Sequence, residues 1–305
     1  MRYTTIASGS SGNCAYVESK QTRLLVDAGL TGKQVEKGLA TVGVDPRTID
    51  AIVVTHEHID HIRGVGVLAR RYKLPVYASE GCWKGMENAI GDVPEAQVRL
   101  IDANKKVTLK NLEIEAFATP HDAREPIGMT VDDGDSRLGI ATDIGYVTRG
   151  MGRRLMDCQG LIFEANHDPK MLQTGPYPAH LKRRIASDKG HLSNPDAGEA
   201  LVKLCDGGVR QVLLAHMSNE NNRPDLAVHT VEAILAEHDH TVTVVGDFAP
   251  PAVVGLEGVL AVAEQRALRW NPSGAQRSGN PGCNRPERVR LSVAPRYEPH
   301  PLEEI

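Results

Sequence analysis

The most informative stretch of the chain reads Val53-Val54-Thr55-His56-Glu57-His58-Ile59-Asp60-His61. It begins as an apolar, β-branched run that predicts a buried strand over residues 51–55. Three imidazoles and two carboxylates follow within six residues. Neutral imidazole and carboxylate oxygen are ligands that bind zinc, manganese or iron. Because the turn after a strand can bring several side chains to one point, this stretch predicts a metal site.

The spacing of these side chains favours two ions. His56 and His58, two residues apart, can converge on one ion, while Asp60 and His61 can reach a second ion nearby. The motif is not His-Glu-x-x-His, because position 60 is aspartate, so the helical zinc site of that motif is excluded. The alternative is a solvated loop that happens to be rich in histidine. Four potential ligands behind an apolar strand favour the metal site.

Further candidate ligands stand at the ends of other predicted strands. His121 follows the strand 112–118, Asp143 follows 137–141, and His216 follows 211–215. Each residue alone would be equally compatible with a position on the surface. Their shared context favours all three as ligands, and the carboxylate of Asp143 could bridge two ions.

The rest of the chain alternates short β-branched runs with helical stretches. Strands are predicted over 3–7, 15–18, 23–26, 74–78, 107–109, 127–131, 161–164 and 241–245, and helices over 32–42, 65–72, 194–204 and 223–237. Strands mixed with helices throughout predict an α/β fold built in layers.

The chain has 305 residues, of which 41% are apolar and 24% charged, which is typical of a globular protein. We predict one domain over residues 1–268 and a disordered tail over 269–305. The last 35 residues hold six of the eighteen prolines, together with Gly, Arg and Ser, and show little periodicity.

Composition also excludes several classes of protein. No apolar run is long enough for a membrane-spanning helix, and the N-terminus lacks the apolar core of a signal peptide, so we predict a cytoplasmic location without membrane contact. The five scattered cysteines form no Cys-x-x-Cys pair, which disfavours a disulfide framework and a cysteine zinc site. A net charge of −4 argues against a general basic coat for nucleic acid, although a local basic channel remains compatible with it.

The ligand series resembles that of the metallo-β-lactamase-fold hydrolases over about residues 1–250. The resemblance implies a four-layer αββα sandwich with a dinuclear site at one edge of its sheets. It implies a first metal on His56, His58 and His121. It places a second metal on Asp60, His61 and His216, with Asp143 bridging. It also matches Asp27, in Leu25-Val26-Asp27-Ala28-Gly29, to the aspartate that supports this site from behind the ligands.

Two further motifs are similar to those of the ribonuclease Z group: Leu161-Ile162-Phe163-Glu164-Ala165-Asn166 and Lys189-Gly190-His191-Leu192-Ser193-Asn194. The similarity implies a proton relay in which Glu164 orients His191, and His191 protonates the leaving oxygen. Cleavage of a phosphodiester expels a poor alkoxide leaving group, so a positioned acid contributes about 10²- to 10⁴-fold. A thioester has less need of such an acid. The alternative for His191 is an ordinary polar residue at a helix start.

The whole pattern resembles the YycJ/WalJ group of this superfamily, including the stretch Ala7–Cys14 and Leu214-Ala215-His216-Met217-Ser218. That resemblance implies a DNA exonuclease, 5′-to-3′ on duplex ends, with two divalent ions (Mn or Zn) and possible repair-protein partners. The glycines and serines of residues 8–13 could form a phosphate-binding nest, although an ordinary tight turn is the alternative. We predict substrate contacts from the following residues: Ser10, Ser11, Asn13, Ser193, Asn194 and Asn222.

Two other functions stay open at this point. The first is a hydrolase of small substrates, such as a cyclic phosphodiesterase or a glyoxalase II-like thioesterase. The second is a metal-binding regulatory protein without turnover, which the loss of a ligand would favour. All seven predicted ligands are present in the sequence.

Overall fold

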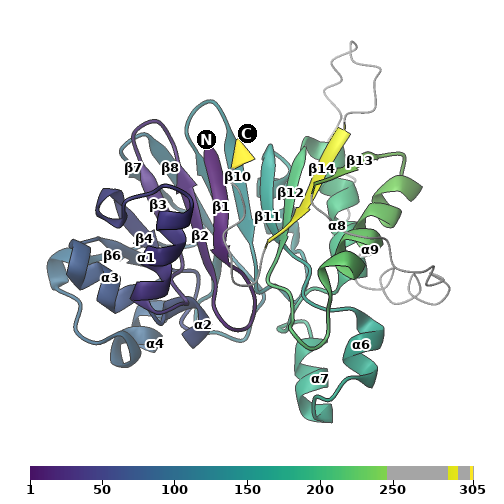
Figure 1. Ribbon diagram of the computed structural model, residues 1–305, viewed down its shortest axis with the longest axis horizontal. Coiled ribbons are helices and arrows are strands. Elements are labelled where there is room, and N and C mark those ends of the chain that lie inside the picture. Colours follow the sequence, from purple (N-terminus) through teal and green to yellow (C-terminus); the bar gives the residue numbers. More distant parts are fainter. Residues whose placement is uncertain (246–287, 295–302, 305) are drawn as a thin grey trace.

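The computed structural model describes residues 1–245, 288–294 and 303–304 (Figure 1). Its strands are β1 (Arg2–Ala7), β2 (Cys14–Glu18), β3 (Arg23–Val26), β4 (Ala51–Val53), β5 (Val76–Ala78), β6 (Val98–Leu100), β7 (Lys106–Leu109), β8 (Leu112–Ala118), β9 (Ile127–Asp132), β10 (Arg137–Ala141), β11 (Gly160–Glu164), β12 (Gln211–Ala215), β13 (Thr241–Val244), β14 (Arg288–Val293) and β15 (Glu303–Glu304). Its α-helices are α1 (Gly32–Thr41), α2 (Ile59–Ile62), α3 (Val65–Tyr72), α4 (Glu80–Ile90), α5 (Arg149–Leu155), α6 (Pro169–Thr174), α7 (Ala179–Ile185), α8 (Asn194–Gly207) and α9 (Pro224–Glu237). Two short 3₁₀ helices are η1 (Pro46–Thr48) and η2 (Glu95–Gln97).

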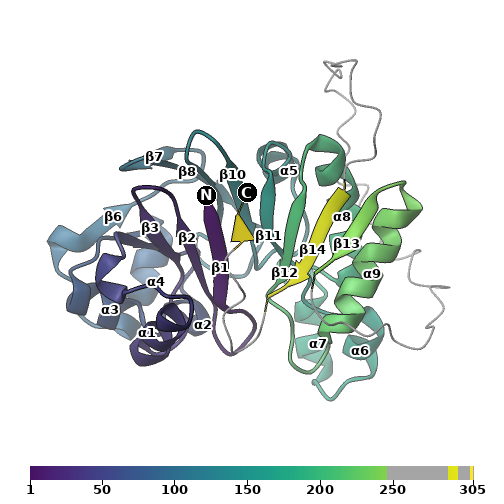
Figure 2. The ribbon, with the colours of Figure 1, turned by 45° about the horizontal axis from the view of Figure 1, so that its top comes forward.

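The strands form two sheets that pack face to face. One sheet has seven strands in the order β15-β1-β2-β3-β4-β5-β6, and the other has eight in the order β13-β14-β12-β11-β10-β9-β8-β7. Helices α1, α3 and α4 cover the outer face of the first sheet, and α8 and α9 cover that of the second (Figures 1 and 2). The predicted four-layer αββα sandwich is therefore confirmed.

The alternation of side chains along each strand explains these layers. In the first sheet, Tyr3 and Leu24 lie in the core between the sheets, whereas Ile6 and Leu25 pack under the helices. Because successive residues of a strand point to opposite faces, a strand buried on both sides must be apolar at nearly every position. Strand β11 follows this rule, since all five of its residues are buried.

Parallel pairing brings the functional strand ends to one edge of the sandwich. Strand β3 pairs in parallel with β4 in the first sheet, and β10, β11 and β12 are parallel neighbours in the second. Their carboxyl ends therefore lie beside one another within each sheet. The short helices α6 and α7 extend beyond the end of the second sheet (Figures 1 and 2).

The predicted disordered tail is wrong for residues 288–293. These residues form β14, which inserts between β12 and β13 and is parallel to both. The physical reason is the alternation of Val289, Leu291 and Val293 with more polar residues, because these three side chains are buried in the core under α8 and α9. The predicted domain boundary at residue 268 lies outside the described residues.

None of the described helices is long and apolar enough to cross a membrane. The cysteines at positions 14, 82, 158 and 205 are buried and free, and Cys283 lies outside the described residues.

Candidate metal centre

The backbone turns sharply at three of the strand ends that carry the site. Asp27 follows β3, Asp143 comes two residues after β10, and His216 follows β12, with φ angles of 60°, 56° and 53°. This left-handed conformation is uncommon for residues other than glycine, although Asp and His adopt it more readily than most. The left-handed conformation at these three residues ends each strand abruptly.

The predicted ligands form two adjacent groups. His56, His58 and His121 can each present a nitrogen within 4.8 Å of one another. A carboxylate oxygen of Asp60 and one ring nitrogen each of His61 and His216 also lie within 4.8 Å of one another. The structure thus brings together the two sets that the resemblance implied.

Asp143 lies between these two groups. Its Oδ2 is 3.3 Å from Nε2 of His61, and its Oδ1 is 3.5 Å from Nε2 of His216 and 3.7 Å from Nε2 of His121. A carboxylate in contact with imidazoles of both groups is placed where a bridging ligand would be required.

Asp27 sets the orientation of His61 from behind. Oδ2 of Asp27 accepts a hydrogen bond of 2.8 Å from Nδ1 of His61, while Oδ1 accepts one of 2.8 Å from the backbone N–H of Thr55. Nε2 of His61 is thereby directed toward Asp143. Burial disfavours the charged imidazole, but the carboxylates of Asp143, Asp27 and Asp60 outweigh it and raise the pKa of His61 to about 9.

The donor set fits a divalent cation. Oδ2 of Asp143 and Nε2 of His216 are buried and have no hydrogen-bond partner within the described part of the chain, and buried polar atoms normally have one. Burial, together with the neighbouring imidazoles, holds the pKa of His56 well below its ordinary value, which favours the neutral ring that binds metals. The His/Asp cluster of this fold implies that the protein binds divalent metal.

His191 and Glu164 form a hydrogen-bonded pair beside this cluster. Oε1 of Glu164 accepts from Nδ1 of His191 at 2.9 Å and from Nδ1 of His216 at 2.8 Å. Its Oε2 accepts from the backbone N–H groups of Ile144 and Leu192. Burial disfavours the carboxylate of Glu164, but the two histidines outweigh it and hold the pKa below its ordinary value. Glu164 is thus a buried carboxylate shared between the metal centre and His191.

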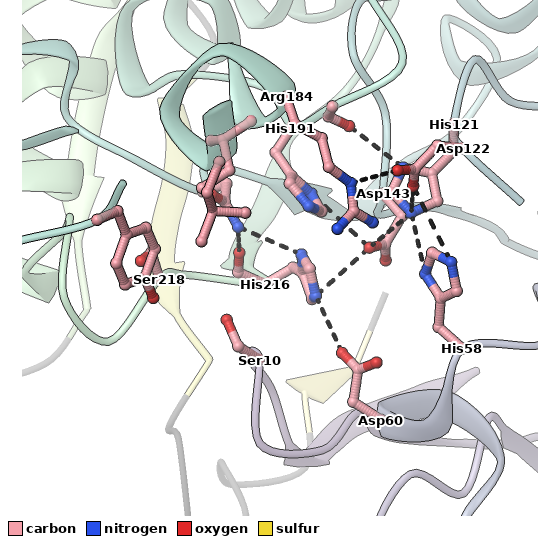
Figure 3. Close-up of a pocket in the computed structure, with 15 residues that line it drawn as sticks. Ser10, His58, Asp60, His121, Asp122, Asp143, Arg184, His191, His216 and Ser218 are labelled. Atoms are coloured by element: carbon pink, nitrogen blue, oxygen red, sulfur yellow. Dashed lines mark hydrogen bonds and ion pairs between the residues drawn. The ribbon is translucent and has the colours of Figure 1, made fainter. Parts of the chain in front are cut away.

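These residues open into a pocket of about 250 Å³, shown in Figure 3. Its lining combines metal-centre residues, His191 and part of α7, and comprises Ser10, His58, Asp60, His121, Asp122, Asp143, Asn166, Tyr177, Leu181, Arg184, Ile185, Gly190, His191, His216 and Ser218. Since Nδ1 of His191 is bonded to Glu164, Nε2 is the ring nitrogen that remains for a bound substrate.

The loop of residues 8–13 connects the two halves of the site. The hydroxyl of Ser8 accepts from the backbone N–H of His216 at 2.7 Å, and the backbone N–H of Asn13 donates to the carbonyl of Asp60 at 2.7 Å. The N–H groups of Gly9 and Gly12 are also used within the loop. The backbone N–H groups of Gly9, Gly12 and Asn13 are therefore not free to form a phosphate-binding nest. Ser10 does line the pocket, and Ser11 is half-buried in the same turn.

Three of the residues predicted to contact the substrate do not line the described pocket. The side-chain amides of Asn194 and Asn222, both buried, donate to each other's oxygen at 2.9 and 2.8 Å. Ser193 is the N-cap of α8, where its hydroxyl accepts from the backbone N–H of Asp196. None of the three lines the described pocket, because they join the loops behind it. Asn13, also buried, has its Nδ2 3.0 Å from Nε2 of His61, beside the ligand atoms, and does not line the described pocket.

The sequence interpretation missed Asp122, whereas Arg184 belongs to the basic stretch 182–189 that leads to His191 and is a weak sequence candidate for a nucleic-acid path. They form an ion pair at the rim of the pocket, with Asp122 also 3.4 Å from Nε2 of His121. Asp122 directly follows a predicted ligand, and Arg184 precedes the His191 motif in a basic stretch, so both carried a weak signal. Glu57, by contrast, uses Oε1 to accept from the backbone N–H of Arg124 and lies outside the ligand groups.

Several known proteins are similar to this chain in sequence. A family model described as the β-lactamase superfamily domain matches residues 22–217. Exodeoxyribonuclease WalJ of Streptococcus pneumoniae is 42% identical over 240 residues, which cover 78% of this chain and 89% of WalJ. Exodeoxyribonuclease YycJ of Bacillus anthracis is 40% identical over 237 residues, which cover 78% and 90%.

Among solved structures, the metallo-β-lactamase fold protein YhfI of Bacillus subtilis superposes with a TM-score of 0.64 at 16% identity, covering 98% of each chain. That likeness concerns the fold. Taken with the matches in sequence, it means that this chain belongs to the β-lactamase superfamily and, within it, to the family of WalJ and YycJ.

Proposed function

We propose that the protein is a metal-dependent exonuclease that degrades duplex DNA from its ends in the 5′-to-3′ direction, in the cytoplasm and in DNA repair. The similarity to the exodeoxyribonucleases WalJ and YycJ supports a DNA substrate. The single observation that carries the proposal is the hydrogen-bonded pair of His191 and Glu164 beside the His/Asp cluster.

The proposal includes two ions, manganese or zinc. His56, His58 and His121 would hold the first, and Asp60, His61 and His216 the second, with Asp143 shared between them. Such a pair of ions lowers the pKa of a water molecule toward about 7 and neutralises charge on phosphate oxygens.

The side chains of the protein carry the proton transfers in this proposal. The attacking water gives up one proton to bulk solvent and forms a phosphorus–oxygen bond, while the bond from phosphorus to the departing 3′ oxygen breaks. His191, through Nε2, gives its proton to that oxygen, and the carboxylate of Glu164 stabilises the charged ring before transfer. Asp143, through Oδ2, accepts a hydrogen bond from the attacking water and keeps it in line.

A positioned acid favours a phosphodiester over a thioester. A thiolate leaves readily without protonation, whereas an alkoxide does not, so a His–Glu pair at this point suits the harder reaction. The half-buried position of His191, with its side chain 20% exposed, lets it reach the pocket while Glu164 remains fully buried.

The test uses metal-stripped protein, duplex DNA labelled at either the 5′ or the 3′ end, and added Mn²⁺ or Zn²⁺. We expect stepwise release of nucleotides from 5′ ends that requires the metal. His191→Ala should lower the rate by about 10²- to 10⁴-fold, while His229→Ala, on α9 away from the pocket, should not. Intact DNA together with turnover of the thioester S-lactoylglutathione would contradict the proposal and support the small-substrate alternative.

A further inference from the structure

One wall of the pocket is made by the helical hairpin α6–α7, residues 169–185. It contributes Tyr177, Leu181, Arg184 and Ile185 to the lining. This hairpin brings no residue into the two ligand groups or the His191–Glu164 pair. Its contribution to the pocket is therefore separate from metal binding and from proton transfer.

Arg184 is the cationic side chain of this wall. Its Nε donates to Oδ2 of Asp122 in an ion pair. Oδ1 of the same carboxylate is 3.4 Å from Nε2 of His121 and 4.0 Å from Nε2 of His58. One carboxylate group thus separates the guanidinium from the first ligand group.

The terminal nitrogens of Arg184 are available to a ligand. Within the described residues, the hydrogen bond of this side chain is the one from Nε, and Nη1 and Nη2 have no partner. The side chain is 56% exposed and lines the pocket, as Figure 3 shows.

The backbone fixes Arg184 relative to His191. The N–H of His191 donates to the carbonyl of Ile185 at 2.9 Å, and the carbonyl of Gly190 lies 3.2 Å from Nδ1 of His121. A Cβ at position 190 would lie 2.3 Å from the carbonyl oxygen of Arg184, so the absence of a side chain at Gly190 allows this close approach. The end of α7 and the His191 turn therefore form one unit.

A guanidinium with two free terminal nitrogens can bind a phosphate group. The planar fork of arginine binds the two non-bridging oxygens of a phosphate with parallel hydrogen bonds. A neutral thioester or lactam offers no such pair of charged oxygens.

We infer that Arg184, held by Asp122, binds the phosphodiester of the substrate beside the metal centre and makes the site selective for a phosphodiester over a neutral thioester. This inference rests on the proposed nuclease function. Asp122 acts as a positioning residue in this account.

The test compares Arg184→Gln, Arg184→Lys and the control Lys170→Gln, using metal-loaded full-length protein and end-labelled duplex DNA. Lys170 is an exposed cation on the same hairpin that does not line the pocket, so its variant removes the same charge elsewhere. We expect Arg184→Gln to raise KM about 10- to 100-fold with a much smaller change in kcat. Arg184→Lys should restore part of the loss, because it keeps the charge without the fork.

The salt dependence provides a second measurement. Removing one phosphate contact should reduce the slope of log KM against log salt concentration by about 1 for Arg184→Gln and leave it unchanged for Lys170→Gln. If wild-type protein degrades DNA and both variants behave alike, the inference on Arg184 is overturned while the nuclease function stands. If wild-type protein with metal leaves DNA intact, the nuclease function itself fails, and the inference fails with it.

Discussion

At the scale of single residues, the metal centre depends on backbone conformations that most side chains avoid. Asp27, Asp143 and His216 all have positive φ angles at the ends of strands. The left-handed conformation costs roughly 1–2 kcal/mol for a residue with a Cβ. Hydrogen bonds around these residues, such as that from the N–H of His216 to Ser8, hold the turns in place.

Asp27→Asn separates the charge of this residue from its conformation, because Asn also tolerates positive φ. Both carboxylate oxygens of Asp27 accept hydrogen bonds, from Thr55 and from His61, and an amide has a single acceptor oxygen. We therefore expect metal affinity to fall by about 10- to 100-fold while the fold is kept. Titration of metal-stripped protein with Mn²⁺ or Zn²⁺, together with circular dichroism, measures both effects.

The matched control is Asp92→Asn, which removes a carboxylate from an exposed loop outside the ligand groups. Equal metal affinity in the two variants would mean that Asp27 does not orient His61 for metal binding.

The ligand residues could be predicted from the local sequence, because they are His or Asp residues that follow an apolar run. The substrate contacts could not be predicted in this way. Asn194 and Asn222 are 28 positions apart, and their mutual hydrogen bonds inside the protein follow from long-range folding. Nothing local distinguishes an asparagine that binds a ligand from one that joins two loops.

At the scale of elements, most strands and helices of the first 245 residues follow their sequence patterns. The helix predicted over 65–72 and the strands predicted over 23–26 and 211–215 have the observed bounds. Helices α2, α4, α5, α6 and α7 were not predicted. Four of them have seven or fewer residues, which is too short for a helical period to stand out, whereas α4 has eleven.

Strand β14 was also missed, for a different reason. Its alternation of apolar and polar residues is regular, but Pro286 and Pro295 stand on either side of it in a stretch rich in Gly and Arg. Composition over a long window therefore obscured a six-residue strand. Its place between β12 and β13 depends on pairing with distant residues, which no local pattern contains.

The burial of β14 leads to a prediction on stability. Leu291 is fully buried in the core under α8 and α9, so Leu291→Ala should lower the free energy of unfolding by about 2–5 kcal/mol through lost burial and a cavity. Urea unfolding followed by circular dichroism measures it. Arg290→Ala, at an exposed position of the same strand, should stay within about 0.5 kcal/mol. Equal, small effects of both substitutions would contradict the packing of β14 in this core.

At the scale of the whole molecule, the site exists only where the two sheets meet. Asp27, His56 and His61 follow strands of the first, seven-stranded sheet. Asp143, Glu164 and His216 lie at the ends of three parallel strands in the second, eight-stranded sheet. Two half-sites on separate sheets approach each other because the core between the sheets is apolar on both faces. The family resemblance predicted this assembly. The basic stretch 182–189 was a weak candidate for a nucleic-acid path, and the structure adds that Arg184 lines the pocket from α7.

The central claim is that this site removes nucleotides from DNA ends, and the most direct measurement compares two DNA molecules of the same sequence. Covalently closed circular duplex and its linear form are incubated with metal-loaded protein, with His191→Ala as the control. We predict complete degradation of the linear form and an intact circle, with neither changed by the variant over the same time. Cleavage of the circle at the same rate, or degradation of the linear form by the variant at the wild-type rate, would contradict the account.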